Sequence, residues 1–178
     1  MRWRQLRIGI LAAAVVLGGC GDDDGTTFEP RLDPEDVAGV YDITRMTFDP
    51  DGSVPPVDIA VRLDPTIRPQ LVVALDLTFQ LAYIDPATKK ITTIDGTYET
   101  LLDGVRLLFP SRQESQRILL PQRLDLLFSE TTGTLSFAGS VDADLPRLVA
   151  LAPEYAQEQF PDPVRGRLEI EFTRRTAE

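Results

Sequence analysis

The clearest pattern along the chain is an alternation of apolar and polar positions over residues 71–83. Its apolar positions are Leu71, Val73, Leu75, Leu77, Phe79, Leu81 and Tyr83. The positions between them include Asp76, Thr78 and Gln80. Successive side chains of a strand point to opposite faces of the sheet, so a period of two indicates one buried face. The pattern predicts a single long strand, with a bend or bulge partway along because of its length.

Shorter runs show the same alternation, at residues 124–128, 134–141 and 168–173. Weaker strand candidates lie at residues 39–48, 57–63, 96–101 and 105–109. Asp103-Gly104 and residues 130–133 are typical of short hairpin connections between neighbouring strands. About eight strands joined in sequence form an antiparallel meander. Such a meander is expected to close into a barrel, because closure removes the unpaired sheet edges.

Two segments break the strand pattern. Residues 111–116 are polar and follow Pro110, which predicts a loop. Residues 144–160 carry spaced apolar side chains around Pro153 and predict one or two short helical turns before the last strand. We expect this insert to cover an end of the barrel. The predicted fold class is therefore all-β, with a short helical insert.

The first twenty residues have a different character. Three arginines among the first seven residues precede an apolar stretch at residues 8–17, which is too short to span a bilayer stably. The run Leu17-Gly18-Gly19-Cys20 then resembles the lipobox of bacterial lipoproteins. This resemblance implies that residues 1–19 are a cleaved signal peptide. It also implies that Cys20 carries a thioether-linked diacylglycerol, and usually an N-acyl chain, which anchor the protein to a membrane.

The anchor sets the expected location and domain organisation. Residues 20–36 are acidic and interrupted by Gly and Pro, which predicts a flexible tether. Residues 37–178 would then form the barrel domain. The resemblance places the protein in the bacterial cell envelope, and Gly21 in place of an aspartate after the cysteine favours the outer membrane.

The composition limits the partners and the catalytic chemistry that the chain can have. Without the signal peptide, 15 basic and 28 acidic residues give a net charge of −13, which argues against nucleic acid as a partner. The chain has no histidine, and lipid occupies its only cysteine, so imidazole-based catalysis, imidazole metal sites and thiol nucleophiles are excluded. We expect no enzyme, no metal and no cofactor other than the covalent lipid.

Several segments together resemble the lipocalin-like domains of bacterial lipoproteins: residues 37–43, Gly96-Thr97-Tyr98-Glu99, residues 124–128 with 133–137, and residues 168–174. Tyr41 stands where the first strand of a lipocalin has a tryptophan. The resemblance implies a barrel that binds small hydrophobic molecules. The candidate interior residues are Leu75, Leu77, Phe79, Tyr83, Tyr98, Phe128, Phe137 and Phe172, with Tyr41, Tyr98 and Arg45 as polar groups that would orient a ligand. Alternatively, these apolar residues are simply core.

Two functions remain open from the sequence. The first is a membrane-anchored envelope protein that binds or carries a small hydrophobic molecule in its barrel. The alternative is a non-catalytic adaptor or assembly protein that contacts another protein through the barrel surface or the insert at residues 144–163. The strands of a transmembrane barrel also alternate apolar and polar residues, but the lipidation signal and the absence of aromatic belts favour a water-soluble barrel. The ligand, the protein partner and the oligomeric state are not specified.

Overall fold

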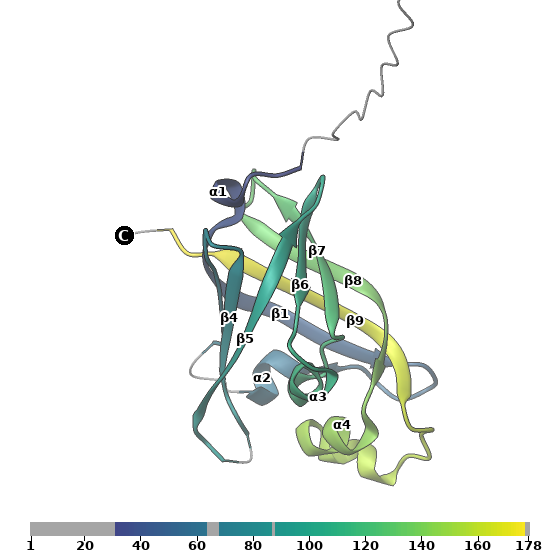
Figure 1. Ribbon diagram of the computed structural model, residues 1–178. Helices are drawn as coiled ribbons and strands as arrows, with labels where there is room; N and C mark the ends of the chain where they lie inside the picture. Colours follow the sequence, from purple (N-terminus) through teal and green to yellow (C-terminus); the bar gives the residue numbers. More distant parts are fainter. Residues whose placement is uncertain (1–30, 64–67, 87, 177–178) are drawn as a thin grey trace, which may run out of the picture.

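The strands form one antiparallel sheet whose spatial order follows the sequence, and the first strand pairs with the last. The computed structural model describes residues 31–63, 68–86 and 88–176. Strands β1 and β3–β9 close into an eight-stranded barrel, while β2 pairs only with the far half of β1. This confirms the all-β meander and its closure into a barrel (Figure 1).

The strands are β1 (Gly39–Pro50), β2 (Val57–Asp58), β3 (Gln70–Val73), β4 (Thr78–Ile84), β5 (Ile91–Thr100), β6 (Gly104–Leu108), β7 (Arg123–Ser129), β8 (Thr134–Ala143) and β9 (Val164–Arg174). The helices are α1 (Pro34–Val37), α2 (Ile59–Leu63), α3 (Arg112–Ser115) and α4 (Leu145–Leu151), with 3₁₀ turns η1 (Gln116–Ile118) and η2 (Pro153–Gln157).

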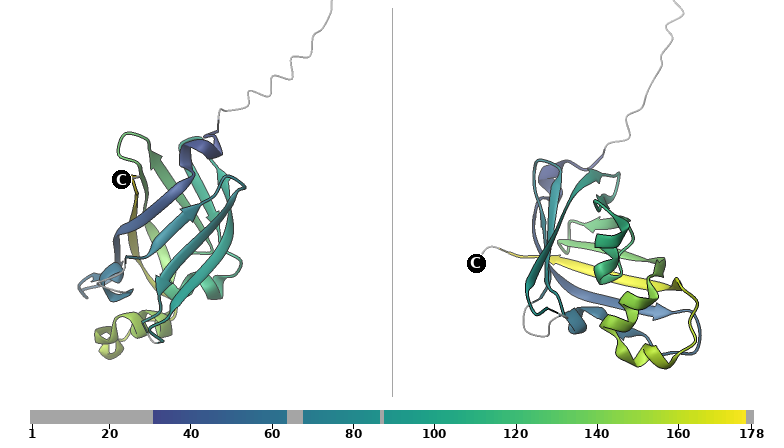
Figure 2. Two further views of the ribbon diagram at one scale, coloured as in Figure 1. Left: turned by 90° about the vertical axis from the view of Figure 1, so that its left-hand side faces the viewer. Right: turned by 60° about the horizontal axis from the view of Figure 1, so that its bottom comes forward.

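The short helices lie at the two ends of the barrel. Helix α1 lies at one end, which we call the α1 end, and α2, α3 and α4 lie at the other, the α4 end (Figures 1 and 2). Leu148, Leu151 and Tyr155 of the α4–η2 segment are buried, and the Tyr155 hydroxyl donates to the carbonyl oxygen of Pro55 at 2.5 Å. The predicted insert before the last strand is therefore present, and its apolar side packs against the barrel.

Residues 71–83 form a hairpin, β3–β4, so the prediction of one long strand is wrong. Val73 pairs with Phe79 across a turn at residues 74–77. The carboxylate of Asp76 accepts from the amide and the hydroxyl of Thr78, at 3.1 and 2.6 Å, and Leu77 takes a left-handed backbone with φ of 65°. The apolar positions are odd-numbered both before and after the turn, so the alternation in the sequence gives no sign of the turn.

Two further local predictions differ from the structure. Residues 57–63 were predicted as a strand, but only Val57–Asp58 pairs with β1, and the chain then turns into α2. Residues 111–116 were predicted as a loop, but they hold α3, whose first turn is capped where the Ser111 hydroxyl accepts from the amide of Glu114. The hairpins at Asp103-Gly104 and at residues 130–133 are confirmed.

The described chain contacts the barrel from Leu32 onward. The Leu32 amide donates to the carbonyl oxygen of Leu101 at 3.0 Å, and Leu32 is partly buried against the core. Residues 32–36, which the sequence assigned to the tether, therefore pack on the α1 end. The proposed signal peptide, Cys20 and the tether up to residue 30 lie outside the described residues. Among the described helices, none has the length and apolar character needed to cross a membrane.

Candidate binding cleft

Five of the ten predicted interior residues are buried inside the barrel: Tyr41, Phe79, Tyr83, Tyr98 and Phe172. They belong to one continuous apolar core, in which the rings of Phe79 and Phe109 meet edge to face with centroids 5.1 Å apart. Burial raises the pKa of each of the three phenols, so all three are neutral at ordinary pH. These residues form a packed centre of the kind that small barrels use for stability.

The two phenols that were expected to orient a ligand already have partners in the protein. The Tyr41 hydroxyl donates to the carbonyl oxygen of Val37 at 2.7 Å and accepts from the guanidinium of Arg174. The Tyr98 hydroxyl donates to the carbonyl oxygen of Ala74 at 2.8 Å. Both groups therefore hold the α1 end of the barrel together.

Arg45 does not reach the interior, which corrects its predicted role. A bulge at Thr44 shifts the register between β1 and β9, so Arg45 points outward and Met46 takes the inward position. The Arg45 side chain is 61% exposed and pairs with Glu169 at 2.6 Å. A strict period of two cannot anticipate this shift, because the extra residue reverses the alternation.

Leu75 and Leu77 also lie outside the barrel. They occupy the β3–β4 turn and are 63% and 43% exposed. Phe128 and Phe137 are only partly buried. Phe137 is inward-facing on β8, yet it remains accessible because the neighbouring strand does not cover it.

That accessibility comes from a gap in the barrel wall between β7 and β8. The two strands pair only from Leu127 to Ser129, opposite Ser136 to Thr134. The first half of β7 pairs with β6 alone, and β8 continues to pair with β9 along its whole length. The strands therefore diverge toward the α4 end and leave an opening, which we call the β7–β8 cleft.

The side chain of Gln116 closes the far end of this gap. It is 5% exposed, and its amide nitrogen donates to the carbonyl oxygens of Leu120 and Asp142, at 2.9 and 3.4 Å. Its amide oxygen accepts from the backbone amide of Asp144 at 2.9 Å. These bonds link the end of β8 and the start of α4 to the segment that leads into β7, so Gln116 supports the arrangement of the two strands at this end.

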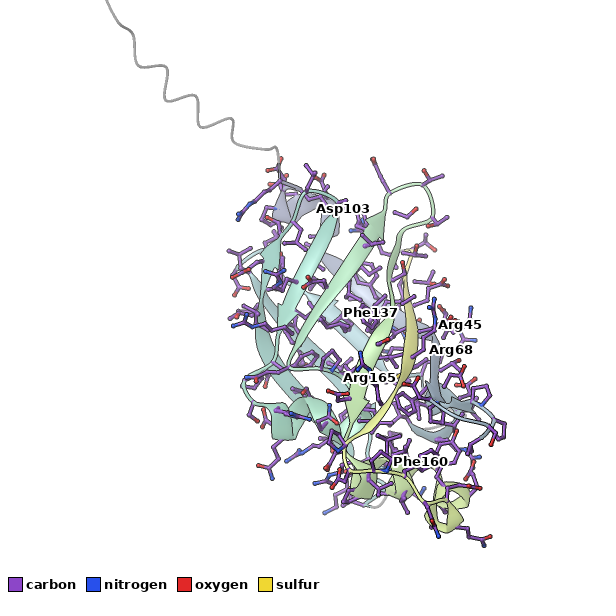
Figure 3. All side chains as sticks on the ribbon, turned by 90° about the vertical axis from the view of Figure 1, so that its right-hand side faces the viewer. Arg45, Arg68, Asp103, Phe137, Phe160 and Arg165 are labelled. Atoms are coloured by element: carbon purple, nitrogen blue, oxygen red, sulfur yellow. The ribbon has the colours of Figure 1, made fainter. Side chains whose placement is uncertain are left out.

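The β7–β8 cleft has a volume of about 730 Å³ and is rimmed by arginines. Its lining residues are Arg106, Arg112, Arg123, Arg165, Asp125, Asp142, Gln116, Gln122, Ser140, Pro121, Phe137 and Val141. Phe137 and Arg165 lie on the same side of the barrel (Figure 3). A smaller hollow of about 370 Å³ shares Arg112 and Gln116 with it and adds Arg147.

The arginines of the cleft differ in how they are paired. Arg106 and Asp125 are opposite each other on β6 and β7 and form a two-pronged ion pair, with N–O distances of 2.7 and 2.8 Å. This hydrogen bonding holds the pKa of Asp125 below its usual range. The side chains of Arg112, Arg123 and Arg165 make no hydrogen bond or ion pair with any described residue. The cleft therefore offers guanidinium groups without a direct carboxylate partner, although the charge of Arg123 also helps to lower the pKa of Asp125, in a protein whose net charge is strongly negative.

Arg106, Arg112, Arg123 and Arg165 are not among the site residues predicted from the sequence. They come from β6, α3, β7 and β9, and the order of these neighbouring strands in the sheet brings them together. The local signal is weak, because an arginine at an outward strand position is common on protein surfaces. Among the described residues, the cleft included, no group of three or more Asp, Glu, His or Cys side chains is placed to hold a metal ion.

Comparisons with known proteins add little. No family model matches the chain, and no curated protein is significantly similar to it. One solved structure with similarity is that of an uncharacterized protein from Bacteroides eggerthii DSM 20697, at 9% identity over 75% of this chain and 98% of that one. The TM-score is 0.34, so this similarity supports no argument about fold or function.

Proposed function

We propose that the chain is a non-catalytic envelope lipoprotein, held to the membrane by lipid on Cys20, that binds a small molecule in the β7–β8 cleft. The favoured ligand has an apolar body and an anionic group such as a carboxylate, sulfonate or phosphate. The observation that carries this proposal is the position of three arginines, unpaired within the described residues, around half-buried Phe137.

The anionic part of the proposal rests on guanidinium chemistry. A free guanidinium presents a planar set of donors that matches the oxygens of carboxylate and phosphate groups. Arg112, Arg123 and Arg165 provide three such groups around one opening. The protein as a whole is acidic, so the attraction for an anion has to come from these nearby guanidinium groups at short range.

The apolar part rests on the floor of the cleft. Phe137 and Val141 present apolar surface to the opening at the point where β7 leaves β8. The volume of about 730 Å³ is of the size that small-molecule sites use. A hydrophobic ligand remains the expected class, but its site would be this lateral cleft, since the predicted orienting phenols inside the barrel are already hydrogen-bonded.

The absence of catalysis is also part of the proposal. The chain has no histidine, and arginine does not exchange protons at ordinary pH. An adaptor role through the insert has weaker support, because Leu148, Leu151 and Tyr155 point into the barrel and so do not form a free apolar face.

The binding site can be tested with anilinonaphthalene sulfonate, a fluorescent probe that has an aromatic body and one anionic group. The protein for this test is the mature chain with Cys20→Ser, which cannot be lipidated. We expect saturable binding that weakens by about tenfold or more in the variant Arg123→Gln/Arg165→Gln, because two guanidinium contacts are lost. The neutral probe N-phenyl-1-naphthylamine should be much less affected.

A matched control is available on the outer surface of the barrel. Arg45 and Arg175 are exposed, pair with Glu169 and Asp42, and are not among the residues that line the cleft. Arg45→Gln/Arg175→Gln removes the same charge and should leave the affinity for the sulfonate unchanged. Equal losses in both double variants, or no saturable binding by the parent protein, would contradict the proposed site.

The anchor needs a separate measurement. Mass spectrometry of the native protein should show an N-terminal peptide that begins at Cys20 and carries acyl chains. A peptide that begins at Met1, with an unmodified thiol, would refute the lipoprotein assignment without bearing on the cleft.

A further inference from the structure

The exposed apolar side chains of the described residues are concentrated at one end of the barrel. Eight large apolar residues are exposed, and six of them lie toward the α1 end: Val40, Val72, Leu75, Leu77, Leu102 and Leu127. The other two, Val61 and Ile91, lie toward the α4 end. We call the first six residues the α1-end patch.

Three leucines of the patch occupy the tips of two hairpins. Leu75 and Leu77 lie in the β3–β4 turn, and Leu102, which is 54% exposed, lies in the β5–β6 turn beside Asp103. The amide of Tyr98 on β5 donates to the carbonyl oxygen of Leu77 at 2.9 Å, which ties the first tip to the neighbouring strand. Asp103 lies at the opposite end of the molecule from Phe160 of the insert (Figure 3). The tips therefore project from the α1 end.

Leu77 is an unfavourable choice at its position unless it has another role. Its φ of 65° lies in the left-handed region, where a leucine side chain costs about 1 kcal/mol relative to glycine. Burial of the rest of the side chain offsets this cost in part, but 43% of the residue stays exposed to water. A contact outside the barrel would supply the missing burial.

The chain leads from this patch toward the anchor. The Leu32 amide is bonded to Leu101, next to Leu102, so the described chain begins at the α1 end. Cys20 precedes Arg31 by 11 positions. Even a fully extended chain of that length spans no more than about 40 Å. A lipid on Cys20 would therefore hold the α1 end near the membrane surface.

We propose that the α1 end rests on the membrane and that the leucines of the two hairpin tips insert into the lipid interface. This proposal depends on the lipidation of Cys20 that is part of the proposed function. Apolar side chains partition into the boundary between headgroups and acyl chains. Asp76, Asp103 and Glu35 are at the same end, so a zwitterionic surface suits the patch better than an anionic one.

A single introduced tryptophan can report on this contact. The only tryptophan, Trp3, lies in the proposed signal peptide, so the mature chain has none. Leu75→Trp and Leu102→Trp place a single fluorophore at each tip. Ile91→Trp is the matched control, because Ile91 is 72% exposed toward the α4 end.

Each variant is attached to phosphatidylcholine vesicles through a maleimide lipid on Cys20, the only cysteine of the chain. This attachment keeps the test independent of natural lipidation, which mass spectrometry decides separately. We expect brominated phosphatidylcholine to quench the two tip tryptophans at least about twofold more than the tryptophan at position 91. Vesicles that contain phosphatidylglycerol should give less quenching at the tips.

Equal quenching at positions 75, 91 and 102, or none at any of them, would overturn the proposal. Tip tryptophans that are shielded from water without being quenched by brominated lipid would also overturn it, in favour of a protein contact. Leu127→Trp reports on the α1-end patch without changing a hairpin tip. Adding Leu75→Ser/Leu77→Ser/Leu102→Ser to this variant should remove most of its quenching, which would show that the leucines cause the quenching.

Discussion

The guanidinium of Arg174, on the last strand, lies over the ring of Tyr41, on the first strand, with 5.3 Å from its carbon to the ring centroid. The two residues are register partners, and Arg174 also donates to the Tyr41 hydroxyl, with N–O distances of 2.8 and 3.1 Å. The same guanidinium lies 5.5 Å from the ring of Phe128 and donates to the carbonyl oxygen of Asp36 in α1. One side chain thus joins β1, β7, β9 and α1 at the α1 end.

Loss of Arg174 should destabilise the barrel. Arg174→Ala removes charged hydrogen bonds and a cation–π contact, and we expect the free energy of unfolding to fall by about 3 kcal/mol. The neighbouring Arg175 provides the control, since its exposed pair with Asp42 should contribute less than about 1 kcal/mol. Denaturant unfolding of both variants measures the difference. Similar losses in the free energy of unfolding for Arg174→Ala and Arg175→Ala would show that the contact with Tyr41 stabilises the protein no more than an exposed ion pair does.

Gln116 should be essential for the shape of the β7–β8 cleft. Gln116→Ala removes the partner of one buried carbonyl oxygen, of one part-buried carbonyl oxygen and of one part-buried amide, so unfolding should become easier by about 2 kcal/mol. Gln113 is exposed on the same helical turn, and Gln113→Ala should change stability by less than about 0.5 kcal/mol. Chemical denaturation reports both values. An effect of Gln116→Ala as small as that of the control would mean that its bonds do not support the strand divergence.

Leu77→Gly should preserve or increase stability. Glycine adopts the left-handed backbone of this position without strain, and we expect a gain of up to about 1 kcal/mol. Leu75→Gly, in the same turn without a positive φ, should instead cost stability because glycine loses more freedom on folding. Thermal unfolding of the two variants gives the sign directly. A clear loss on Leu77→Gly would indicate that the leucine side chain stabilises the turn itself.

Stability should decline at alkaline pH. Burial raises the pKa of all four tyrosines, Tyr41, Tyr83, Tyr98 and Tyr155. The unfolded chain releases these protons from about pH 10, while the folded chain still holds them. The folded state therefore keeps its full stability below about pH 10 and loses it as the pH rises toward the folded-state pKa values. Denaturant titrations and tyrosinate absorbance should show tyrosine ionisation together with unfolding. Ionisation near pH 10 without loss of structure would contradict this account.

The architecture could be predicted from local pattern, because an alternation with one buried face indicates a strand wherever it occurs. The exceptions arise where a local feature leaves the alternation intact or reverses it. The β3–β4 turn keeps the alternation in phase, and its only signal was Asp76 followed by Thr78, the pair that forms an Asx turn. The bulge at Thr44 reverses the phase and moves Arg45 outside.

The candidate site was less accessible to sequence reasoning. Aromatic residues at inward positions were expected to line a cavity, but inward position alone does not distinguish a packed core from a ligand site. Phe137 became accessible because β7 and β8 separate, and that separation depends on Gln116 and a helical segment distant in sequence from β8. Arg106 and Arg165 come together because β6 to β9 are neighbouring strands of the sheet, although the two residues are far apart in the sequence.

The most direct test of the central claim is a map of amide chemical-shift changes as anilinonaphthalene sulfonate is added to the unlipidated mature chain. Binding in the β7–β8 cleft predicts saturable changes centred on residues 122–125 and 137–142, with small changes at Phe79, Leu81 and Tyr98 in the core. The largest changes at those core residues, or no saturable changes in either region, would contradict a lateral site.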